Sequence, residues 1–480
     1  MYRLDEDTII NEQDLENWRR THYSFQINPS QINQTIIIMG WISSKRDHGN
    51  VLFIQLRDKF GDTQVVVKKK GNNLENEIFD VLKNLKEHSS IGIKGKVVEQ
   101  KKSSTSVEIV PEEIKVLSVS TKSAPFLTQA ISNIGIDTRL ELRALDLRRD
   151  YLQNIFKIRF TILNSIREFL ISNYFIEVHT PKMIATATEG GAALFPIFYY
   201  DKEAFLAQSP QLYKEQLTMA FENVFEIAPI FRAEPSRTNR HLSEAISIDV
   251  EKAFVNYHDV MKLLDELVAY IILKIKEKNQ TELNNLELEL PDIQIPFPRY
   301  SYSELVDKLQ KNHKYIRWGD DISPKILKDI VGDSFYYIVD WPLSTKPFYV
   351  KPKNYSDIIG LPPNSTTTTT TTTTISNENQ KDKESESNRI VSESFDLMYG
   401  TLELSSGSTR LNNKNILLDN MKKKGLNHAA FDYHLRVFDY GVPPHAGFGL
   451  GLERFIMALL KIENIRDATF YPRDIDRLTP

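Results

Sequence analysis

The sequence contains no cysteine among its 480 residues. This absence excludes disulfide-stabilised scaffolds, thiolate zinc sites and enzymes with a cysteine nucleophile. Neither charge dominates, because 60 Lys and Arg stand against 64 Asp and Glu, for a net charge of −4. A protein that coats nucleic acid through bulk positive charge is therefore not expected, and any binding of nucleic acid must depend on particular residues.

The sequence also lacks an apolar run near the roughly 20 residues that cross a bilayer. Its first residues, MYRLDEDTIINEQDLENW, show no basic segment followed by an apolar one. We therefore expect a cytoplasmic protein that does not act at a membrane. With 41% hydrophobic residues, the chain has enough apolar side chains for two or three domains with large cores.

Residues 34–120 contain five short strand-like runs: TIIIMGWI, VLFIQLRD, TQVVVKK, IGIKGKVVE and SVEIV. A helical segment, residues 76–88, precedes the fourth run. This order predicts an OB-fold barrel over residues 34–120, after an N-terminal extension of residues 1–33. The alternative is a small all-β domain without a ligand.

The stretch 121–149 is mixed and ends in the charged TRLELRALDLRRD, so we expect a hinge there. From Asp150 apolar residues recur at helical spacing, which predicts an amphipathic helix ending before Phe175. Strand-like and helical patterns then alternate, so residues 150–480 should form a second, α+β domain. Within it, 364–389 contains nine consecutive threonines and is expected to be a disordered insertion.

Two segments of this second domain are candidates for chemistry. In PIFRAEPSRTNRHLSEA, Arg232 directly follows an apolar strand-like run, and its guanidinium could clamp a phosphate. An exposed basic cluster is more often a solvated face. In GFGLGLERF, a glycine-rich strand leads into Glu453 and Arg454 without matching the usual nucleotide-binding patterns. Alone, it could be only a close contact between a helix and a sheet.

Together these segments resemble a known family. FRAE…RHL is similar to motif 2 of the class II aminoacyl-tRNA synthetases, GLGLERF to motif 3, and the helix leading into FIEVHTP to motif 1. FLAQSPQLYK and FYPRDIDRLTP further resemble aspartyl-tRNA synthetases of the archaeal and eukaryotic type. The resemblance implies an antiparallel sheet flanked by helices after the OB-fold, and a homodimer with Pro181 at its interface.

The implied reaction is the ATP-dependent activation of L-aspartate to aspartyl-adenylate, followed by transfer to the 3′ end of tRNA(Asp). Arg232 and Arg454 would be catalytic, and Glu403 and Ser406 would bind Mg²⁺, which prefers oxygen ligands. The implied ATP-binding residues are Arg232, Glu234, Arg240, His241, Glu403, Gly451, Leu452, Glu453 and Arg454.

The implied aspartate-binding residues are Glu189, Gln211, Lys214, Arg232, Ser406 and Arg410. Glu189 and Gln211 would read the substrate ammonium group. Lys214 and Arg410 would face the side-chain carboxylate, because an amide in its place would leave two cations without a partner. Taken singly, each carboxylate is more often a salt-bridge partner than a ligand of substrate.

In the OB-fold, the resemblance implies that Phe53 and Gln64 contact anticodon bases by stacking and hydrogen bonding. Phe53 could instead be a core residue. Two other functions stay open: an asparaginyl-tRNA synthetase and a catalytically weak tRNA-binding paralogue. The segment SGSTRLN departs from the family pattern at Ser408, Thr409 and Asn412, close to the expected substrates.

Overall fold

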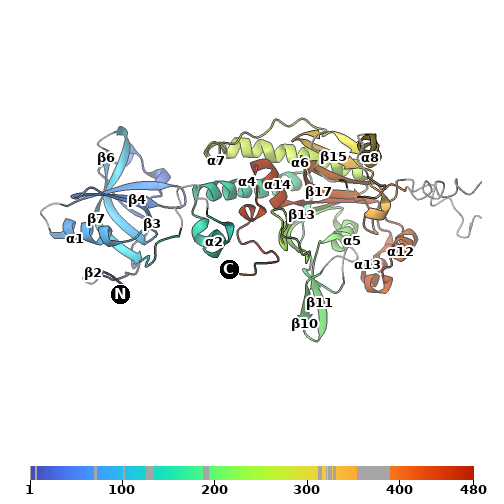
Figure 1. Ribbon diagram of the computed structural model, residues 1–480, viewed down its shortest axis with the longest axis horizontal. Coiled ribbons are helices and arrows are strands. Elements are labelled where there is room, and N and C mark those ends of the chain that lie inside the picture. Colours follow the sequence, from blue (N-terminus) through green and yellow to red (C-terminus); the bar gives the residue numbers. More distant parts are fainter. Residues whose placement is uncertain are drawn as a thin grey trace, which may run out of the picture. The chain divides into compact units, whose positions relative to one another are not determined.

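A computed structural model describes residues 2–5, 8–69, 73–100, 103–125, 134–186, 194–311, 316–320, 322, 327, 331–353 and 390–480. The chain forms two compact units, Met1–Ile134 and Gly135–Pro480 (Figure 1). The predicted threonine-rich insertion at 364–389 lies outside the described residues.

The first unit is built on a closed five-stranded barrel in the order β3-β4-β5-β7-β6. Its elements are β3 (Thr35–Asp47), β4 (Val51–Arg57), β5 (Asp62–Lys68), α1 (Asn73–Asn84), β6 (Ser90–Gln100) and β7 (Ser103–Ser118). Alternate residues of the strands, such as Leu52 and Ile54, fill its interior. The predicted OB-fold, with a helix before its fourth strand, is confirmed.

The first 33 residues belong to this unit and are not a separate extension. They form β1 (Tyr2–Asp5), β2 (Thr8–Ile10), η1 (Ser24–Gln26) and η2 (Pro29–Gln31). Ile10 is buried in the barrel's hydrophobic cluster, and the Gln13 amide donates to the carbonyl of Val116 at 2.8 Å. These contacts fix the segment against β7.

The second unit contains an eight-stranded sheet in the order β14-β15-β16-β17-β18-β13-β12-β8. The strands are β8 (Ile176–Glu177), β12 (Asn223–Phe231), β13 (Glu244–Ala253), β14 (Arg299–Ser301), β15 (Phe335–Val339), β16 (Ser394–Tyr399), β17 (Leu402–Thr409) and β18 (His445–Gly451). Neighbours are antiparallel except for β12 with β8 and β14 with β15. The predicted antiparallel sheet flanked by helices is confirmed.

Three helices, α4 (Asp150–Ser172), α6 (Tyr257–Lys278) and α14 (Leu452–Leu460), share one core with the sheet. The long helices α4 and α6 lie side by side (Figure 1). On β13, Ile248 and Val250 point into this core, whereas Asp249 and Glu251 alternate to the opposite face. Helix α5 (Gln211–Phe221) packs against β12 and β13, and its Lys214 bonds to Asp249. That face of the sheet carries the polar groups.

The other elements of this unit are shorter. The helical ones are α2 (Ile136–Glu141), α3 (Arg143–Asp146), α7 (Gln280–Asn285), α8 (Tyr302–Lys311), η3 (Leu343–Thr345), α12 (Lys414–Lys423), η4 (His428–Phe431), α13 (Asp432–Leu435), η5 (Arg436–Tyr440) and η6 (Ile465–Ala468). A separate small sheet contains β9 (Met183–Ile184), β10 (Pro196–Tyr199) and β11 (Lys202–Leu206), and Figure 1 shows its β10-β11 hairpin projecting from the body of the unit.

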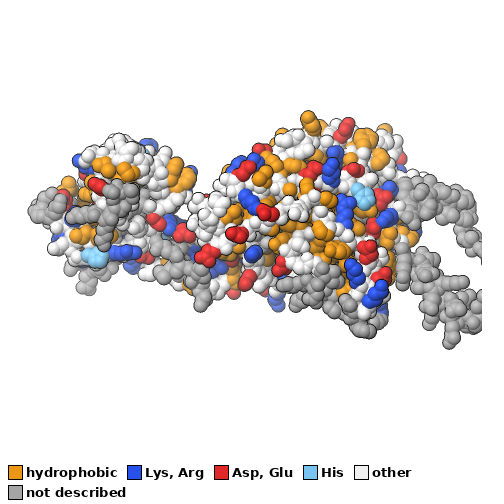
Figure 2. Space-filling view, turned by 90° about the horizontal axis from the view of Figure 1, so that it is seen from above, with side chains coloured by type: hydrophobic (Ala, Val, Ile, Leu, Met, Phe, Trp, Pro, Cys, Tyr) orange, Lys and Arg blue, Asp and Glu red, His pale blue; other side chains and the backbone are white. Residues whose placement is uncertain are grey.

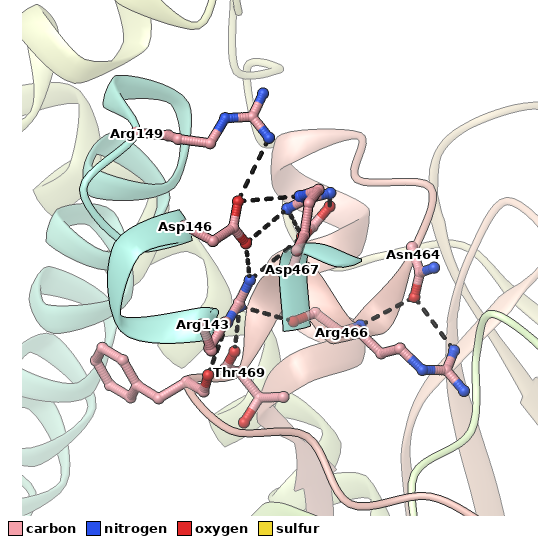
Figure 3. Close-up of polar contacts among 9 residues, drawn as sticks. Arg143, Asp146, Arg149, Asn464, Arg466, Asp467 and Thr469 are labelled. Carbon is pink, nitrogen blue, oxygen red and sulfur yellow. Dashed lines mark hydrogen bonds and ion pairs between the residues drawn. The ribbon is translucent and has the colours of Figure 1, made fainter. Parts of the chain in front are cut away.

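The hinge predicted at 121–149 needs correction, because residues from Gly135 onward belong to the second unit. Arg143 is buried and donates to the carbonyl groups of Thr469 at 2.7 Å and Phe470 at 2.8 Å (Figure 3). Its Nη1 also lies 2.6 Å from Asp146. The charged sequence suggested a surface linker, but its arginines bind the C-terminal segment in the interior.

Charged side chains of both signs are mixed on the face of the second unit shown in Figure 2. This mixing agrees with the near balance of charges in the sequence. Among the helices that the structure describes, none combines the length and apolarity needed to cross a membrane.

Candidate active site

A cavity of about 320 Å³ lies on the polar face of the large sheet. Its walls come from α5, the loop between β12 and β13, strands β16 to β18 and the start of α14. The predicted residues that line it are Gln211, Arg232, Glu234, Arg240, His241, Glu403, Ser406, Arg410, Gly451, Glu453 and Arg454. Lys214 and Leu452 are buried behind the wall, and Glu189 lies outside the described residues.

Arg232 stands at the point where β12 ends. Its backbone N–H donates to the carbonyl of Ser243 at 2.9 Å, which closes the loop between β12 and β13. The C-terminal segment fixes that loop, since the Ser243 amide donates to Arg473 O at 2.8 Å and the Ile465 amide to Asn239 O at 2.9 Å. The Arg232 side chain is exposed and lines the cavity, so its guanidinium is available to an anion.

Arg454 lies in the first turn of α14, next to the buried Glu453. Glu453 is fixed by Arg159 at 3.0 Å and by the amide of Ile246 at 3.0 Å. Burial lowers the pKa of Arg454; Glu403 opposes this shift, and the positive charge of Arg232 adds to it. Two arginines that repel each other at one cavity suit a ligand with several negative oxygens.

His241 faces the same arginines. Burial lowers its pKa, and the charges of Arg454 and Arg232 lower it further against the opposing effect of Glu234. The ring is therefore neutral at pH 7 and can pack on an aromatic ligand without adding charge. Its Nδ1 lies 2.5 Å from Thr238 Oγ1, which fixes the ring orientation.

A pair of carboxylates could hold a metal ion. Burial raises the pKa of Glu403, and the charge of Asp396 raises it further, although Arg454 and Lys346 oppose the shift. Asp396 bonds to Lys346 at 2.9 Å and lies directly across from Ser406 in the sheet. Asp396 is buried and Glu403 is exposed at the cavity, and both offer the oxygen ligands that Mg²⁺ prefers.

The sequence prediction missed Asp396, although an acid inside the apolar run SFDLMY was a signal. Among the described residues, no group of three or more His, Cys, Asp or Glu side chains could hold a metal ion. Glu403, Asp396 and Ser406 offer only two carboxylates and a hydroxyl, so a metal ion here would need further oxygen ligands from outside the protein.

Lys214 and Arg410, which were predicted to face the side-chain carboxylate of aspartate, both have acidic partners within the protein. Lys214 is only 2% exposed, and its Nζ lies 3.0 Å from Asp249 and 3.3 Å from Glu251. Arg410 lines the cavity, but it donates to Ser408 Oγ at 2.6 Å, and its Nε and Nη2 bind Glu251. Two cations therefore face two carboxylates, and this cluster is balanced in charge.

The two acids come from β13, where ISIDVE alternates apolar and polar residues, a signal that could have revealed them. Glycine makes room for Glu251: a Cβ on Gly447 would lie 2.2 Å from Glu251 Oε2. Burial alone would lower the pKa of Arg410, but the charge and hydrogen bonds of Glu251, together with Tyr349 and Glu215, outweigh burial and raise it. Both terminal nitrogens of Arg410 keep a second N–H beyond their bonds to Glu251 and Ser408, so Arg410 can still bind a ligand carboxylate.

In the first unit, Phe53 and Gln64 share one face of the barrel. Phe53 pairs with Val66 and Gln55 with Gln64, so these side chains point to the same side. Phe53 is half-buried and outside the hydrophobic cluster, which contradicts the core alternative. Gln64 donates to Glu108 at 3.0 Å and accepts from Gln55 at 3.4 Å, so a base must compete with these bonds.

Comparison with known proteins identifies the family. Residues 135–475 match the tRNA synthetases class II (D, K and N), and residues 36–117 match the OB-fold nucleic acid binding domain. The chain belongs to this class of tRNA synthetases, as the resemblance of its motifs predicted.

Relatives that are similar over their full length include archaeal proteins. The chain is 40% identical to the aspartate–tRNA(Asp/Asn) ligase of Methanosarcina barkeri, over 96% of this chain and 99% of that protein. It is 41% identical to the protein of the same name from Archaeoglobus fulgidus, over 95% of this chain and 99% of that protein.

Solved structures with the same fold include asparaginyl-tRNA synthetase from Pyrococcus horikoshii with asparaginyl-adenylate. The TM-score between the two is 0.83 and the sequence identity is 29%, and the match covers 96% of this chain and 100% of the Pyrococcus protein. A putative aspartyl-tRNA synthetase from Leishmania major Friedlin matches with a TM-score of 0.79 and 25% identity. This match covers 98% of this chain and 97% of the Leishmania protein.

Proposed function

We propose that the protein is an aspartate–tRNA ligase. It uses ATP to convert L-aspartate into aspartyl-adenylate and transfers the aspartyl group to the 3′ end of tRNA(Asp), as a cytoplasmic step of translation. The observation that carries the proposal is the grouping of Arg232, Arg454 and Glu403 around one cavity, with Arg410 at its wall. These are the charges that two anionic substrates, ATP and aspartate, require.

In the first step, the α-carboxylate of aspartate attacks the α-phosphate of ATP and pyrophosphate leaves. Arg232 bridges the carboxylate and the α-phosphate, while Arg454 binds the distal phosphates and packs beside the adenine with His241. Glu403, Ser406 and Asp396 would hold Mg²⁺, which would supply positive charge beside the phosphates. The protein mainly positions the reactants and stabilises negative charge that develops during transfer.

The remaining ATP contacts come from the walls described above. Glu234 and Arg240 stand in the loop between β12 and β13, and Arg240 also reaches the carbonyl of Thr401 at 3.4 Å. Gly451 leaves space for a ligand where β18 leads into α14. The next two residues, Leu452 and Glu453, are buried and pack beneath this turn.

Arg410 binds the side-chain carboxylate of aspartate, with Lys214 supporting it by sharing Glu251. Gln211 accepts from the substrate ammonium, and Glu189 is proposed for the same role on the family pattern. The alternative amino acid is asparagine, because synthetases for both share this fold. Arg410 favours aspartate, since an amide cannot satisfy its two spare N–H groups.

The partner in the second step is tRNA, recognised through the barrel. Phe53 offers a half-exposed ring, and Gln64 offers an amide on the same face. Stacking on one aromatic ring contributes about 1–3 kcal/mol per base. The named relatives act on tRNA(Asp/Asn), so charging of tRNA(Asn) belongs in the same test.

The homodimer is proposed on an apolar strip along and after α4. Phe160 is 67% exposed and Ile171 57%, and Tyr174 beyond the helix is 87% exposed. Phe160 and Ile171 lie about three turns apart, so they share one side of α4. Pro181 is exposed just downstream. Exposed apolar strips of this kind mark protein interfaces.

The function is tested by ATP–pyrophosphate exchange with aspartate and asparagine supplied separately, followed by aminoacylation of tRNA(Asp) and tRNA(Asn). Exchange with aspartate alone supports the proposal. Exchange with asparagine alone would make the protein an asparaginyl enzyme. Binding of tRNA without exchange would make it a catalytically weak tRNA-binding paralogue.

A further inference from the structure

Glu215 is a buried acid behind the cavity, one helical turn after Gln211 on α5. It is 1% exposed and does not line the cavity, whereas Gln211 does. Gln211 Nε2 donates to Glu215 Oε1 at 2.6 Å, and this bond is buried. A carboxylate placed one layer behind a substrate-facing amide can control how that amide is turned.

The charge of Glu215 is secured by its other neighbours. Its Oε2 lies 3.5 Å from His434 Nε2 and 3.7 Å from His445 Nε2. Burial alone would raise the pKa of Glu215, but His445, His434 and Arg410 outweigh it and lower the pKa to about 2. Glu215 is therefore ionised and can only accept hydrogen bonds.

The pKa values of the two imidazoles shift in opposite directions. His445 Nδ1 lies 2.8 Å from the carbonyl of Pro443 and so carries a proton, while Glu215 raises its pKa against the effect of burial. Burial lowers the pKa of His434, whose Nδ1 accepts from Gln216 Nε2 at 3.2 Å. Both rings place Nε2 beside Glu215 Oε2, so the carboxylate lies between two imidazoles.

An ionised carboxylate fixes the orientation of a neighbouring amide. The NH₂ end of Gln211 must face Glu215, so its Oε1 points elsewhere, and among the described residues no donor is bonded to that oxygen. We propose that Glu215 is a positioning residue that turns the carbonyl oxygen of Gln211 into the cavity, where it accepts from the α-ammonium of the amino acid. This rests on the proposed function and deepens it.

The test separates an effect through Gln211 from a purely structural one. Glu215→Met removes the acceptor at similar volume, so the amide can turn its NH₂ toward the ammonium. The aspartate KM in ATP–pyrophosphate exchange should rise ~10-fold, with the ATP KM unchanged. Inhibition by succinate, a dicarboxylate without the ammonium, should keep its Ki. A matching loss of succinate binding would overturn the proposal.

A double-variant cycle supplies the second readout. In a Gln211→Met background, Glu215→Met should change the aspartate KM less than ~2-fold, because the amide it positions is gone. Full additivity of the two losses would overturn the proposal. Glu215→Gln keeps an oxygen that can accept from Gln211, so it should raise the KM by less than ~3-fold.

A further pair of variants applies even where Glu215→Met does not fold. Gln211→Glu places two carboxylates together and should weaken aspartate binding, and adding Glu215→Gln should restore it to within ~3-fold of wild type. Failure to restore it overturns the proposal. If the wild type uses asparagine and not aspartate, the proposed substrate fails, but the asparagine KM tests Glu215 equally, because asparagine carries the same ammonium.

Discussion

The guanidinium of Arg410 binds the carboxylate of Glu251 through two nitrogens, with Nε at 3.0 Å and Nη2 at 3.2 Å. Lys214 shares that carboxylate at 3.3 Å and also binds Asp249 at 3.0 Å. The cations are thus held in place before any ligand arrives. In the proposed function, selection of an acidic amino acid would depend on the spare N–H groups of Arg410 and not on an unbalanced buried charge, which would be costly.

Replacing Arg410 by Leu should abolish aspartate activation, because the ligand carboxylate and Glu251 both lose their fork of donors. We expect kcat/KM for aspartate to fall at least ~10³-fold, about 4 kcal/mol. ATP binding, measured by calorimetry, should persist. Arg436→Leu is the control, since its pair with Asp432 is exposed. Normal aspartate affinity in Arg410→Leu would refute the assignment.

Asp396→Asn should raise the Mg²⁺ concentration that gives half-maximal exchange by ~10-fold, because it removes one of the two carboxylates proposed for the ion. The aspartate KM at saturating Mg²⁺ should change little. Asp419→Asn on the exposed side of α12 is the matched control. An unchanged Mg²⁺ requirement would show that the pair of Asp396 with Lys346 is only structural.

Phe53→Ala should raise the KM for tRNA by about one to two decades through lost stacking. ATP–pyrophosphate exchange should be unaffected, since it needs no tRNA. Because Phe53 lies outside the barrel core, the melting temperature should stay close to wild type. Leu52→Ala, at a buried neighbour, should instead destabilise the barrel by about 2–5 kcal/mol. An unfolded barrel or unchanged charging in Phe53→Ala would remove this residue from the tRNA site.

Phe160→Asp should convert the proposed dimer into a monomer, because a carboxylate in an apolar interface loses its hydration. The mass in solution, measured by light scattering, should halve. Phe25→Asp, at a ring that is 64% exposed in the first unit, is the control and should leave the mass unchanged. A monomeric wild type would contradict the proposed dimer directly.

Much of the fold could be predicted because its patterns are local. The alternation of apolar residues predicted the barrel strands. Helical spacing predicted a helix from Asp150 that ends before Phe175, and the observed α4 spans Asp150–Ser172. The end of α1 was less predictable: helix 76–88 was expected, but α1 ends at Asn84. Lys45, remote in sequence, donates to the carbonyl of Lys83 at 2.6 Å and satisfies that end of the helix.

In the candidate site, too, residues within local motifs could be predicted, whereas contacts between distant segments could not. Arg232 and Arg454 could be predicted because each follows a strand within a short motif. The partners of Lys214 could not, because Asp249 and Glu251 reach it from a strand that only the folded sheet brings near. The hinge predicted at 121–149 was wrong at Arg143 for the same reason, since three acceptors of Arg143 are carbonyl groups over 300 residues away, such as Phe470 O.

The raised pKa of Asp265 should make the stability of the second unit depend on pH. Burial raises its pKa to about 6, and the hydrogen bond from Tyr337, at 2.7 Å, opposes the shift only in part. Between its unfolded pKa near 4 and about 6, the folded state binds the proton more tightly, so the contribution of Asp265 to stability decreases as pH rises through this window.

Asp265→Asn removes the charge but keeps an oxygen that can accept from Tyr337. We expect the variant to melt about 2 °C or more above wild type at pH 8, because the wild type then buries a carboxylate. At pH 4.5 the difference should shrink, since wild-type Asp265 is protonated in the folded state. Thermal unfolding at both pH values, with the exposed Asp292→Asn as the control, measures the change. A stability difference that is equal at pH 4.5 and pH 8 would mean that the pKa of Asp265 is not raised. Other groups would then offset the cost of burying its charge.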